Sequence, residues 1–417
     1  MAGIRNPYRP GFNQAPEILA GREDVMEDLL DALEAVAVDR FTPPPLLLVG
    51  SRGMGKTTLL AEAASRAGRE YGWPAVQVEL EPDKSFTEEL AAKLDAVATL
   101  VEQHGPRRAM QAQSATLQAK IAGVGGEVRF ERASKNEPRS VREAFAQLAS
   151  NLRERDSGFV LTLDEAHLAD HAEMVAFAKM LQEATGNDWP AVVLLAGLPA
   201  MRDPDHTVTY FERGTWHELG LLQRPEAIAA LQEPADRAGR PMDPDASELL
   251  AQASGGYPYA LQLLGHHAWR QSANQPRIDA DAAKRALPRA QRQLERGLYA
   301  SRWEAAPPTH RRYLAAVAEL TSAGQLASSR AVADRQGKST KDLSKIRDQL
   351  IKYGTLTVQN DSLRFTIPGM ADYVARQQAH EVHDASFPGQ PAAAITPPPP
   401  APQPRRDTRD QSRQPER

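Results

Sequence analysis

The hydrophobic pattern of the first two hundred residues alternates between amphipathic helices and short apolar runs. Residues 24–37 carry apolar side chains three and four positions apart, which predicts an amphipathic helix. Short apolar runs bounded by proline, glycine or polar residues are typical of buried strands in a parallel sheet. They occur at 46–49, 76–80, 159–163 and 191–196, with helical spacing between them at 56–68, 141–155 and 174–184. The alternation predicts an α/β fold whose parallel-sheet core covers residues 1–222.

The strand pattern stops near residue 224 and gives way to helical spacing. Four helices are predicted at 225–239, 245–253, 259–272 and 279–298, and we assign residues 223–300 to an all-α lid. Three more helices are predicted at 311–320, 328–336 and 340–353, followed by runs at 355–358 and 363–367 that predict a hairpin. Helices and a hairpin in this order predict a winged helix-turn-helix domain over residues 301–380.

Two segments fall outside this pattern. Residues 104–140 contain Gly123, Gly125 and Gly126 and a short alternating run. For this segment we favour a hairpin or a loose excursion over a regulatory or DNA-contacting loop. Residues 381–417 hold nine of the 32 prolines and few large apolar residues. Such a composition cannot bury enough surface to offset chain entropy, so we predict a disordered tail.

Composition removes several classes of function. The 417 residues include no cysteine, which excludes disulfide scaffolds, thiolate zinc sites and cysteine nucleophiles. No apolar run approaches 18 residues and the N-terminus has no signal-peptide pattern, so we expect a cytoplasmic protein with no membrane contact. The net charge of −4 argues against a surface that binds nucleic acid throughout, yet residues 302–380 carry twelve basic and seven acidic residues.

A glycine-rich segment directly follows the first predicted strand and matches the P-loop motif G-x-x-x-x-G-K-[ST] completely. In this motif, backbone N–H groups approach phosphate oxygens, and the N-terminus of the following helix adds positive charge. Lys56 is placed to reach the β- and γ-phosphates, and the Thr57 hydroxyl is placed to ligate Mg²⁺. The residues predicted to bind the nucleotide here are Gly50, Ser51, Arg52, Gly53, Met54, Gly55, Lys56, Thr57 and Thr58.

Two acidic residues end the third predicted strand, as in a Walker B motif. Asp164 is placed to hold the Mg²⁺ shell, and Glu165 to orient and polarise the attacking water. The adjacent glutamate favours hydrolysis over transfer to a bound acceptor. Residues 164–167, Asp-Glu-Ala-His, are similar to a helicase motif, but no other helicase motif follows. A guanine-specificity motif is absent from the sequence. A transporter-like signature at 254–256 follows Walker B, whereas in transporters this signature precedes it.

Three further segments resemble features of known ATPases. Residues 18–23, Ile-Leu-Ala-Gly-Arg-Glu, look like the h-x-G-R box of origin-recognition-like AAA+ ATPases and of the related STAND signalling ATPases. Asn6-Pro7-Tyr8 resembles the opening of bacterial members, and Gly256-Tyr257-Pro258 resembles the G-x-P motif of a STAND-type lid. The resemblance covers about residues 6–380 and implies a P-loop core, a lid and a winged helix, with ATP and Mg²⁺ as cofactors. It also implies that Gly21 and Arg22 lie against the adenine and that Pro258 contacts the nucleotide.

The chain departs from these families at two places. Its fourth strand ends Leu195-Ala196-Gly197-Leu198-Pro199, where origin-recognition ATPases carry a polar sensor residue. Tyr257-Pro258 stands where a lid arginine reads the γ-phosphate. Both departures favour a slow nucleotide switch over a motor.

Arg213 lies between the fourth strand and a fifth at 216–219, where the resembling ATPases carry an arginine finger that faces the neighbouring subunit. This reading implies a nucleotide-dependent homo-oligomer. The alternative is an arginine on a solvated helix end, paired with Glu212 or Asp205.

These features lead to three functional hypotheses. The first is an ATP-controlled protein that binds duplex DNA through its winged helix, with Lys341, Lys345, Arg347 and Arg364 as contacts. The second is a signalling or defence ATPase whose winged helix packs on protein. The third is a nucleotide-binding scaffold without turnover.

Overall fold

The computed structural model describes residues 5–11, 16, 18–121, 139–202 and 208–386. The described residues up to Ala375 form one compact unit, and those from Arg376 onward belong to a second. Across these described segments, no helix is both long enough and apolar enough to cross a membrane.

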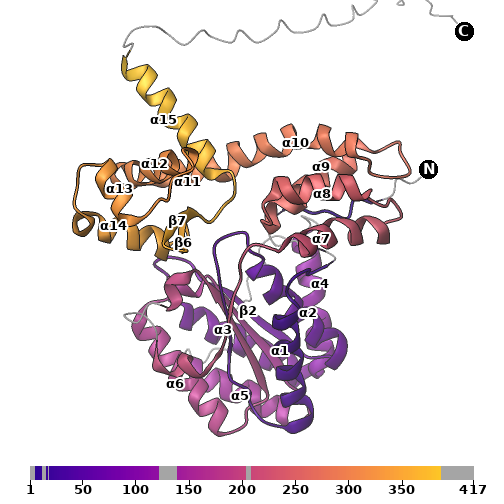
Figure 1. Ribbon diagram of the computed structural model, residues 1–417. Coiled ribbons are helices and arrows are strands. Elements are labelled where there is room, and N and C mark those ends of the chain that lie inside the picture. Colours follow the sequence, from indigo (N-terminus) through magenta and orange to yellow (C-terminus); the bar gives the residue numbers. More distant parts are fainter. Residues whose placement is uncertain (1–4, 12–15, 17, 122–138, 203–207, 387–417) are drawn as a thin grey trace, which may run out of the picture. The chain divides into compact units, whose positions relative to one another are not determined.

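The first unit is built on a five-stranded, fully parallel sheet (Figure 1). Its strands are β1 (Leu46–Val49), β2 (Ala75–Glu79), β3 (Phe159–Asp164), β4 (Ala191–Gly197) and β5 (Thr215–Glu218). They lie in the order β2-β3-β4-β1-β5, with Leu46 of β1 beside Leu194 and Thr215. The four apolar runs that predicted strands are therefore confirmed, each to within one residue at either end.

Helices cover both faces of this sheet. On one face lie α1 (Glu23–Glu34), extended by the π-helical turn η1 (Ala35–Asp39), and α2 (Lys56–Tyr71). On the other lie α3 (Phe86–His104), α5 (Val141–Arg153) and α6 (His171–Gly186). Successive strand residues point to opposite faces, so Leu46 and Leu48 pack with the first group and Leu47 with the second.

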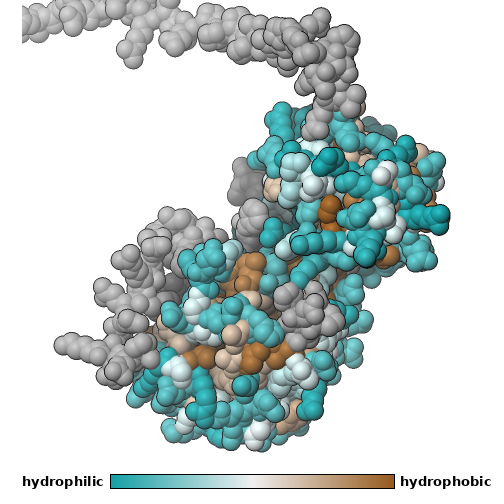
Figure 2. All heavy atoms as spheres, turned by 90° about the vertical axis from the view of Figure 1, so that its left-hand side faces the viewer, coloured by the Kyte–Doolittle hydropathy of each residue, from teal (hydrophilic) through white to brown (hydrophobic). Residues whose placement is uncertain are grey.

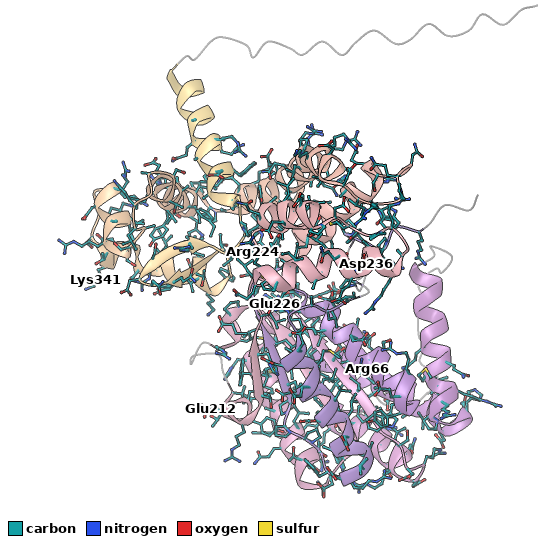
Figure 3. The ribbon with its side chains drawn as sticks, turned by 45° about the vertical axis from the view of Figure 1, so that its right-hand side comes forward. Arg66, Glu212, Arg224, Glu226, Asp236 and Lys341 are labelled. Carbon is teal, nitrogen blue, oxygen red and sulfur yellow. The ribbon has the colours of Figure 1, made fainter. Side chains whose placement is uncertain are left out.

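Polar side chains remain on the outside of these layers. The face of the molecule seen in Figure 2 is mainly hydrophilic, with hydrophobic residues showing in small groups. Arg66 on α2 (Figure 3) lies 3.5 Å from Glu62, one helical turn earlier. The apolar strands therefore form a core that is closed on both sides, as expected for a parallel sheet.

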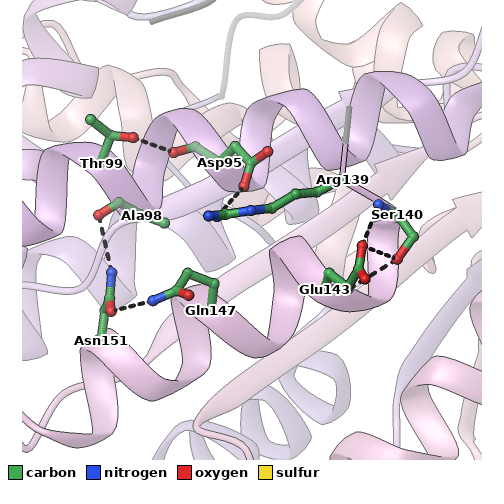
Figure 4. Close-up of polar contacts among 8 residues, drawn as sticks. All are labelled: Asp95, Ala98, Thr99, Arg139, Ser140, Glu143, Gln147 and Asn151. Atoms are coloured by element: carbon green, nitrogen blue, oxygen red, sulfur yellow. Dashed lines mark hydrogen bonds and ion pairs between the residues drawn. The ribbon is translucent and has the colours of Figure 1, made fainter. Parts of the chain in front are cut away.

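Polar contacts fix α5 against α3 (Figure 4). Ser140 and Glu143 form a capping box at the start of α5, which satisfies free N–H groups of its first turn. Asn151 is buried, and its Nδ2 donates to the carbonyl oxygen of Ala98 on α3 at 3.3 Å. Since α5 leads directly into β3, these contacts also fix the approach of the strand that carries the predicted acidic pair.

The four predicted helices after the sheet are confirmed. They are α7 (Arg224–Arg237), α8 (Pro244–Ser254), α9 (Pro258–Gln271) and α10 (Ala280–Leu294). Helix α10 continues through a π-helical turn, η5 (Glu295–Tyr299), into α11 (Ala300–Ala305). The predicted boundary at residue 300 thus falls inside a continuous helical run, and the limits at 222, 300 and 380 stay predictions.

Three helices and an antiparallel hairpin follow. They are α12 (Pro308–Ser322), α13 (Ser329–Arg335), α14 (Thr340–Lys352), β6 (Leu356–Gln359) and β7 (Ser362–Phe365). Ser339 and Asp342 form a capping box at the start of α14. Asn360 and Asp361 take up left-handed backbone angles in the two-residue turn, a conformation that these residue types tolerate. The predicted order of elements is therefore found.

Two expectations need correction. The favoured hairpin or loose excursion at 104–140 is wrong for its first half, because residues 106–121 form helix α4 (Pro106–Ile121). The glycine-rich part of that segment lies outside the described residues. The tail predicted to be disordered from residue 381 begins with helix, since α15 (Met370–Ser386) continues until just before Pro388. Residues 387–417 lie outside the description.

Candidate active site

The P-loop leaves the carboxyl end of β1 and leads into α2. The N–H of Gly50 donates to the carbonyl oxygen of Gly197 at 3.2 Å, which ties the start of the loop to the end of β4. Gly53 and Gly55 have φ angles of 82° and 91°, which side chains with a Cβ atom rarely adopt. A Cβ on Gly53 would also collide with the Tyr257 hydroxyl, whereas the space beside Gly55 is open. The sequence therefore places glycine where the loop needs a left-handed turn and a close approach.

Lys56 is the first residue of α2, and only 6% of it is exposed. Its Nζ donates to the carbonyl oxygens of Gly50 at 2.8 Å and Ser51 at 3.0 Å. Burial lowers the pKa of Lys56, and the carboxylates of Glu165 and Asp164 oppose this shift. The loop carbonyls thus hold the ammonium group at the place where phosphate oxygens would approach.

The two residues predicted to ligate Mg²⁺ are in direct contact. The Thr57 hydroxyl donates to Oδ2 of Asp164 at 2.5 Å, and the N–H of Glu165 donates to Oδ1 of Asp164 at 2.8 Å. A hydroxyl beside a carboxylate is a hard-oxygen donor pair that fits Mg²⁺. No cluster of three His, Asp or Glu residues able to hold a metal occurs among the described residues. Thr57 and Asp164 are therefore the residues that would hold Mg²⁺ here.

Glu165 follows β3 with a φ angle of 54°, which is unusual for a residue other than glycine. Its Oε2 atom is buried and has no hydrogen-bond partner in the described part of the chain. Burial raises the pKa of Glu165, and the neighbouring Asp164 raises it further. Backbone strain and an unsatisfied buried oxygen are both features of functional carboxylates.

His167 was not identified from the sequence as part of the site. Its side chain is buried, and its Nδ1 lies 3.3 Å from Oε2 of Glu165. The N–H of Leu198, just after β4, points to the same Nδ1 at 3.4 Å, which assigns the ring proton to Nε2. Burial lowers the pKa of His167 to about 4. A neutral imidazole therefore lies between the Walker B strand and the end of β4, where the sequence offers no polar sensor side chain.

The P-loop and the acidic pair line one cavity of about 440 Å³. Leu222, Ile18 and Leu19 give it an apolar part, and Pro258 and Tyr259 contribute from α9. Of the residues predicted to act here, the lining includes Arg22, Arg52, Gly53, Met54, Gly55, Lys56, Thr57, Thr58, Asp164, Glu165 and Pro258. Gly21, Gly50, Ser51 and Arg213 are not part of the lining.

Arg22 joins three segments around this cavity. Its guanidinium donates to the carbonyl oxygens of Gly220 at 2.8 Å and Met54 at 3.2 Å. Burial lowers its pKa, and the nearby carboxylates of Glu226 and Glu23 oppose this shift. Arg22 of the h-x-G-R box thus links the P-loop to the segment between β5 and α7 by hydrogen bonds. It also lines the cavity.

Arg213 lies far from its own P-loop along the sheet. It is exposed and ends the short helix η4 (Thr209–Arg213), directly before β5. Since β5 runs parallel to β1, Arg213 sits at the amino edge of the sheet, whereas the P-loop leaves the carboxyl edge. Arg213 cannot serve the nucleotide site of its own chain, and its role in trans stays a prediction.

Comparisons with known proteins agree with this core. Residues 18–194 match the AAA ATPase domain family, and residues 296–374 match a domain of unknown function (DUF8462). No curated protein matches the chain. The structure is similar to the Walker-type ATPase PABY2304 of Pyrococcus abyssi, with a TM-score of 0.56 and 16% identity over 86% of this chain and 97% of that one.

Two other solved structures have lower TM-scores. The RuvB Holliday junction branch migration motor of Thermotoga maritima gives 0.44, with 17% identity over 88% of this chain and 95% of that one. The Aeropyrum pernix ORC1 protein in complex with DNA gives 0.42, with 16% identity and the same coverage of 88% and 95%. The family match, the parallel sheet and the first structural similarity support an AAA+ P-loop ATPase core.

The buried neutral His167 predicts a specific acid sensitivity. The unfolded chain binds a proton at this histidine below about pH 6.5, whereas the folded chain does so only near pH 4. The neutral His167 therefore contributes its full share of the unfolding free energy above pH 6.5, and this contribution is lost as the pH falls toward 4. Between pH 7 and pH 5, we expect His167 to account for on the order of 1–2 kcal/mol of lost unfolding free energy.

Urea unfolding midpoints at pH 7 and pH 5 test this. His167→Gln should show a smaller drop between the two pH values than the parent, and the exposed His171→Gln is the control. Equal drops in His167→Gln and the parent would contradict the assignment of a buried neutral imidazole.

Proposed function

We propose that this protein binds and slowly hydrolyses ATP as a molecular switch, and that its C-terminal domain is a winged helix that binds duplex DNA. The observation that carries the first part is the contact between Thr57 and Asp164, beside the unsatisfied oxygen of Glu165. A P-loop, a hard-oxygen pair and a second carboxylate that line one cavity are what phosphoanhydride hydrolysis requires.

Each group has a separate task in this proposal. Lys56 and the P-loop N–H groups bind the phosphates, while Thr57 and Asp164 hold Mg²⁺. The ion neutralises charge on the phosphate oxygens. Glu165 accepts a hydrogen bond from the water that attacks the γ-phosphorus, and the bond from that phosphorus to the β-γ bridging oxygen breaks. His167, being neutral, adds no positive charge beside Glu165.

Two substitutions test this assignment. Lys56→Ala should reduce affinity for a fluorescent ATP analogue by on the order of 100-fold, because the phosphates lose their main cationic partner. Glu165→Gln should retain ATP but lower phosphate release by on the order of 100-fold, because the water loses its polarising group. Glu102→Gln, an exposed glutamate on α3, is the control. Turnover at the parental rate in Glu165→Gln would exclude Glu165 as the residue that activates water.

We further propose that Arg213 acts in trans in a nucleotide-dependent homo-oligomer. A guanidinium supplied by a neighbour stabilises the charge that develops on the leaving phosphoryl group. Its exposure at the edge of the sheet opposite the P-loop is compatible with contact to a second chain.

This proposal predicts that activity per chain rises with protein concentration. Arg213→Ala should lower turnover by at least about tenfold, with ATP affinity nearly intact. Arg237→Ala, another exposed arginine, is the control. Mixing Arg213→Ala with Glu165→Gln should restore part of the activity. The nucleotide site of an Arg213→Ala chain keeps its own Glu165 and can receive Arg213 from a Glu165→Gln neighbour. If the two proteins associate and the mixture stays inactive, Arg213 is not a trans finger.

For the C-terminal domain, α14 is the proposed recognition helix and β6-β7 the wing. Lys341, Lys345 and Arg364 are exposed, and no ion pair joins any of them to another described residue. Figure 3 shows Lys341 pointing away from the body of the protein at the start of α14. Recognition helices present their N-terminal residues to the bases, so this end of α14 is suited to contact DNA. Arg347 is less available, because its guanidinium contacts Asp348 at 2.7 Å and Ser329 at 3.3 Å.

DNA binding through α14 predicts a steep salt dependence. Lys341→Ala/Lys345→Ala should weaken duplex binding by about tenfold and reduce the slope of log affinity against log salt by about 1–2. Lys84→Ala/Lys284→Ala removes two exposed lysines elsewhere and should leave both values unchanged. The absence of DNA binding at low salt, with ADP and with an ATP analogue, would favour the alternative in which the domain packs on protein.

A further inference from the structure

Among the described residues that line the nucleotide cavity, one side chain carries an amide group. This residue, Gln262, stands on α9, one turn after Pro258, which also lines the cavity. The Tyr257 hydroxyl donates to the carbonyl oxygen of Arg52 at 2.9 Å, so α9 begins against the P-loop. One helical turn places Gln262 about 6 Å farther along the helix axis. Gln262 is therefore displaced along α9 from the loop that binds the phosphates in the proposed function.

The N-terminal segment, residues 6–9, is held against α7 and α9. Nδ2 of Asn6 lies 3.1 Å from Nδ1 of His266 on α9. The ring of Tyr8 is buried, and its hydroxyl donates to the carbonyl oxygen of Leu231 on α7. Because these contacts hold the chain at Asn6 and at Tyr8, the backbone of the next residue, Arg9, has a fixed position beside α9.

This segment orients the amide of Gln262. The backbone N–H of Arg9 donates to Oε1 of Gln262 at 3.1 Å. A backbone N–H is only a donor, so the amide oxygen must face it and the NH2 group must point elsewhere. Within the described residues, Nε2 of Gln262 forms no hydrogen bond to the protein. Gln262 therefore keeps a donor group for a ligand, while its oxygen is engaged by the backbone.

A purine base fits the surroundings of this amide. Ile18, Leu19, Ala230 and Leu261 are among the apolar residues that line the same cavity, and apolar walls suit the faces of an aromatic ring. Proteins distinguish unpaired bases by hydrogen bonds to their Watson–Crick edge. On that edge, the ring nitrogen N1 of adenine is an acceptor, whereas N1 of guanine carries a hydrogen and is a donor. A single oriented donor at the wall therefore matches adenine and opposes guanine.

We propose that Nε2 of Gln262 donates to the ring nitrogen N1 of adenine, and that this contact selects adenine over guanine nucleotides. Residues 6–9 hold the amide in the orientation that the selection needs. With guanine, two donors would face each other and both would lose a hydrogen bond, which lowers affinity. This inference rests on the proposed nucleotide binding.

The test compares affinities of the full chain for non-hydrolysable ATP and GTP analogues, measured by displacement of a ribose-labelled fluorescent ATP analogue. The parent should bind the ATP analogue at least about tenfold more tightly. Gln262→Glu keeps the shape and can still accept from the N–H of Arg9, but it replaces the donor by an acceptor that suits guanine. It should lower the ratio of ATP to GTP affinity by about tenfold or more. The control, Gln252→Glu, changes an exposed glutamine on α8 and should keep the parental ratio.

A nucleotide altered at one atom checks the same contact without a change in the protein. In 1-deaza-ATP a C–H group replaces N1, so the parent should bind it about tenfold more weakly than ATP, whereas 7-deaza-ATP should bind within about threefold. A parental ratio in Gln262→Glu, or equal affinity for ATP and 1-deaza-ATP, would overturn the inference and leave the proposed ATPase intact. If Gln262→Glu does not fold, the comparison of the two deaza nucleotides in the parent decides. A parent that binds neither ATP nor GTP would overturn the proposed function, and the inference with it.

Discussion

The hydrogen bond between the Thr57 hydroxyl and the Asp164 carboxylate joins the two halves of the active site. Thr57 lies at the start of α2 and Asp164 at the last position of β3. The hydrogen bond between them therefore forms only if the sheet holds these two ends at the right distance. That alignment depends on β4, which lies between β3 and β1 and is buried along its whole length. The position of the P-loop relative to the acidic pair therefore depends on how β4 aligns the carboxyl ends of β1 and β3.

Around this contact, the protein retains polar groups that its own residues do not satisfy. Oε2 of Glu165 is buried and has no hydrogen-bond partner among the described residues. Lys56 is satisfied only by loop carbonyls, which are weaker partners for an ammonium ion than phosphate oxygens. Such groups destabilise the unliganded fold, and a ligand that satisfies them recovers that free energy on binding. Binding of the proposed nucleotide would give Lys56 such partners.

Local signals explain which parts could be predicted from sequence. The strands, the P-loop and the Walker B pair follow from apolar runs, glycine spacing and acidic residues within a few positions of one another. Helix α4 was missed because its sequence has a weak apolar periodicity and adjoins a glycine-rich stretch. His167 was visible only as the end of an Asp-Glu-Ala-His run, because its burial depends on Leu198, more than thirty positions away.

The surroundings of His167 also bear on the expected rate of ATP hydrolysis. At the end of β4 the chain supplies the Leu198 N–H and the neutral ring of His167 in place of a polar sensor side chain. A neutral imidazole that accepts from a backbone N–H cannot donate to Glu165 or to phosphate from that nitrogen. It therefore adds no positive charge to the transition state. In the proposed function, Arg213 of a neighbouring chain supplies the missing positive charge. Turnover would then stay slow until two chains associate, as expected of a switch.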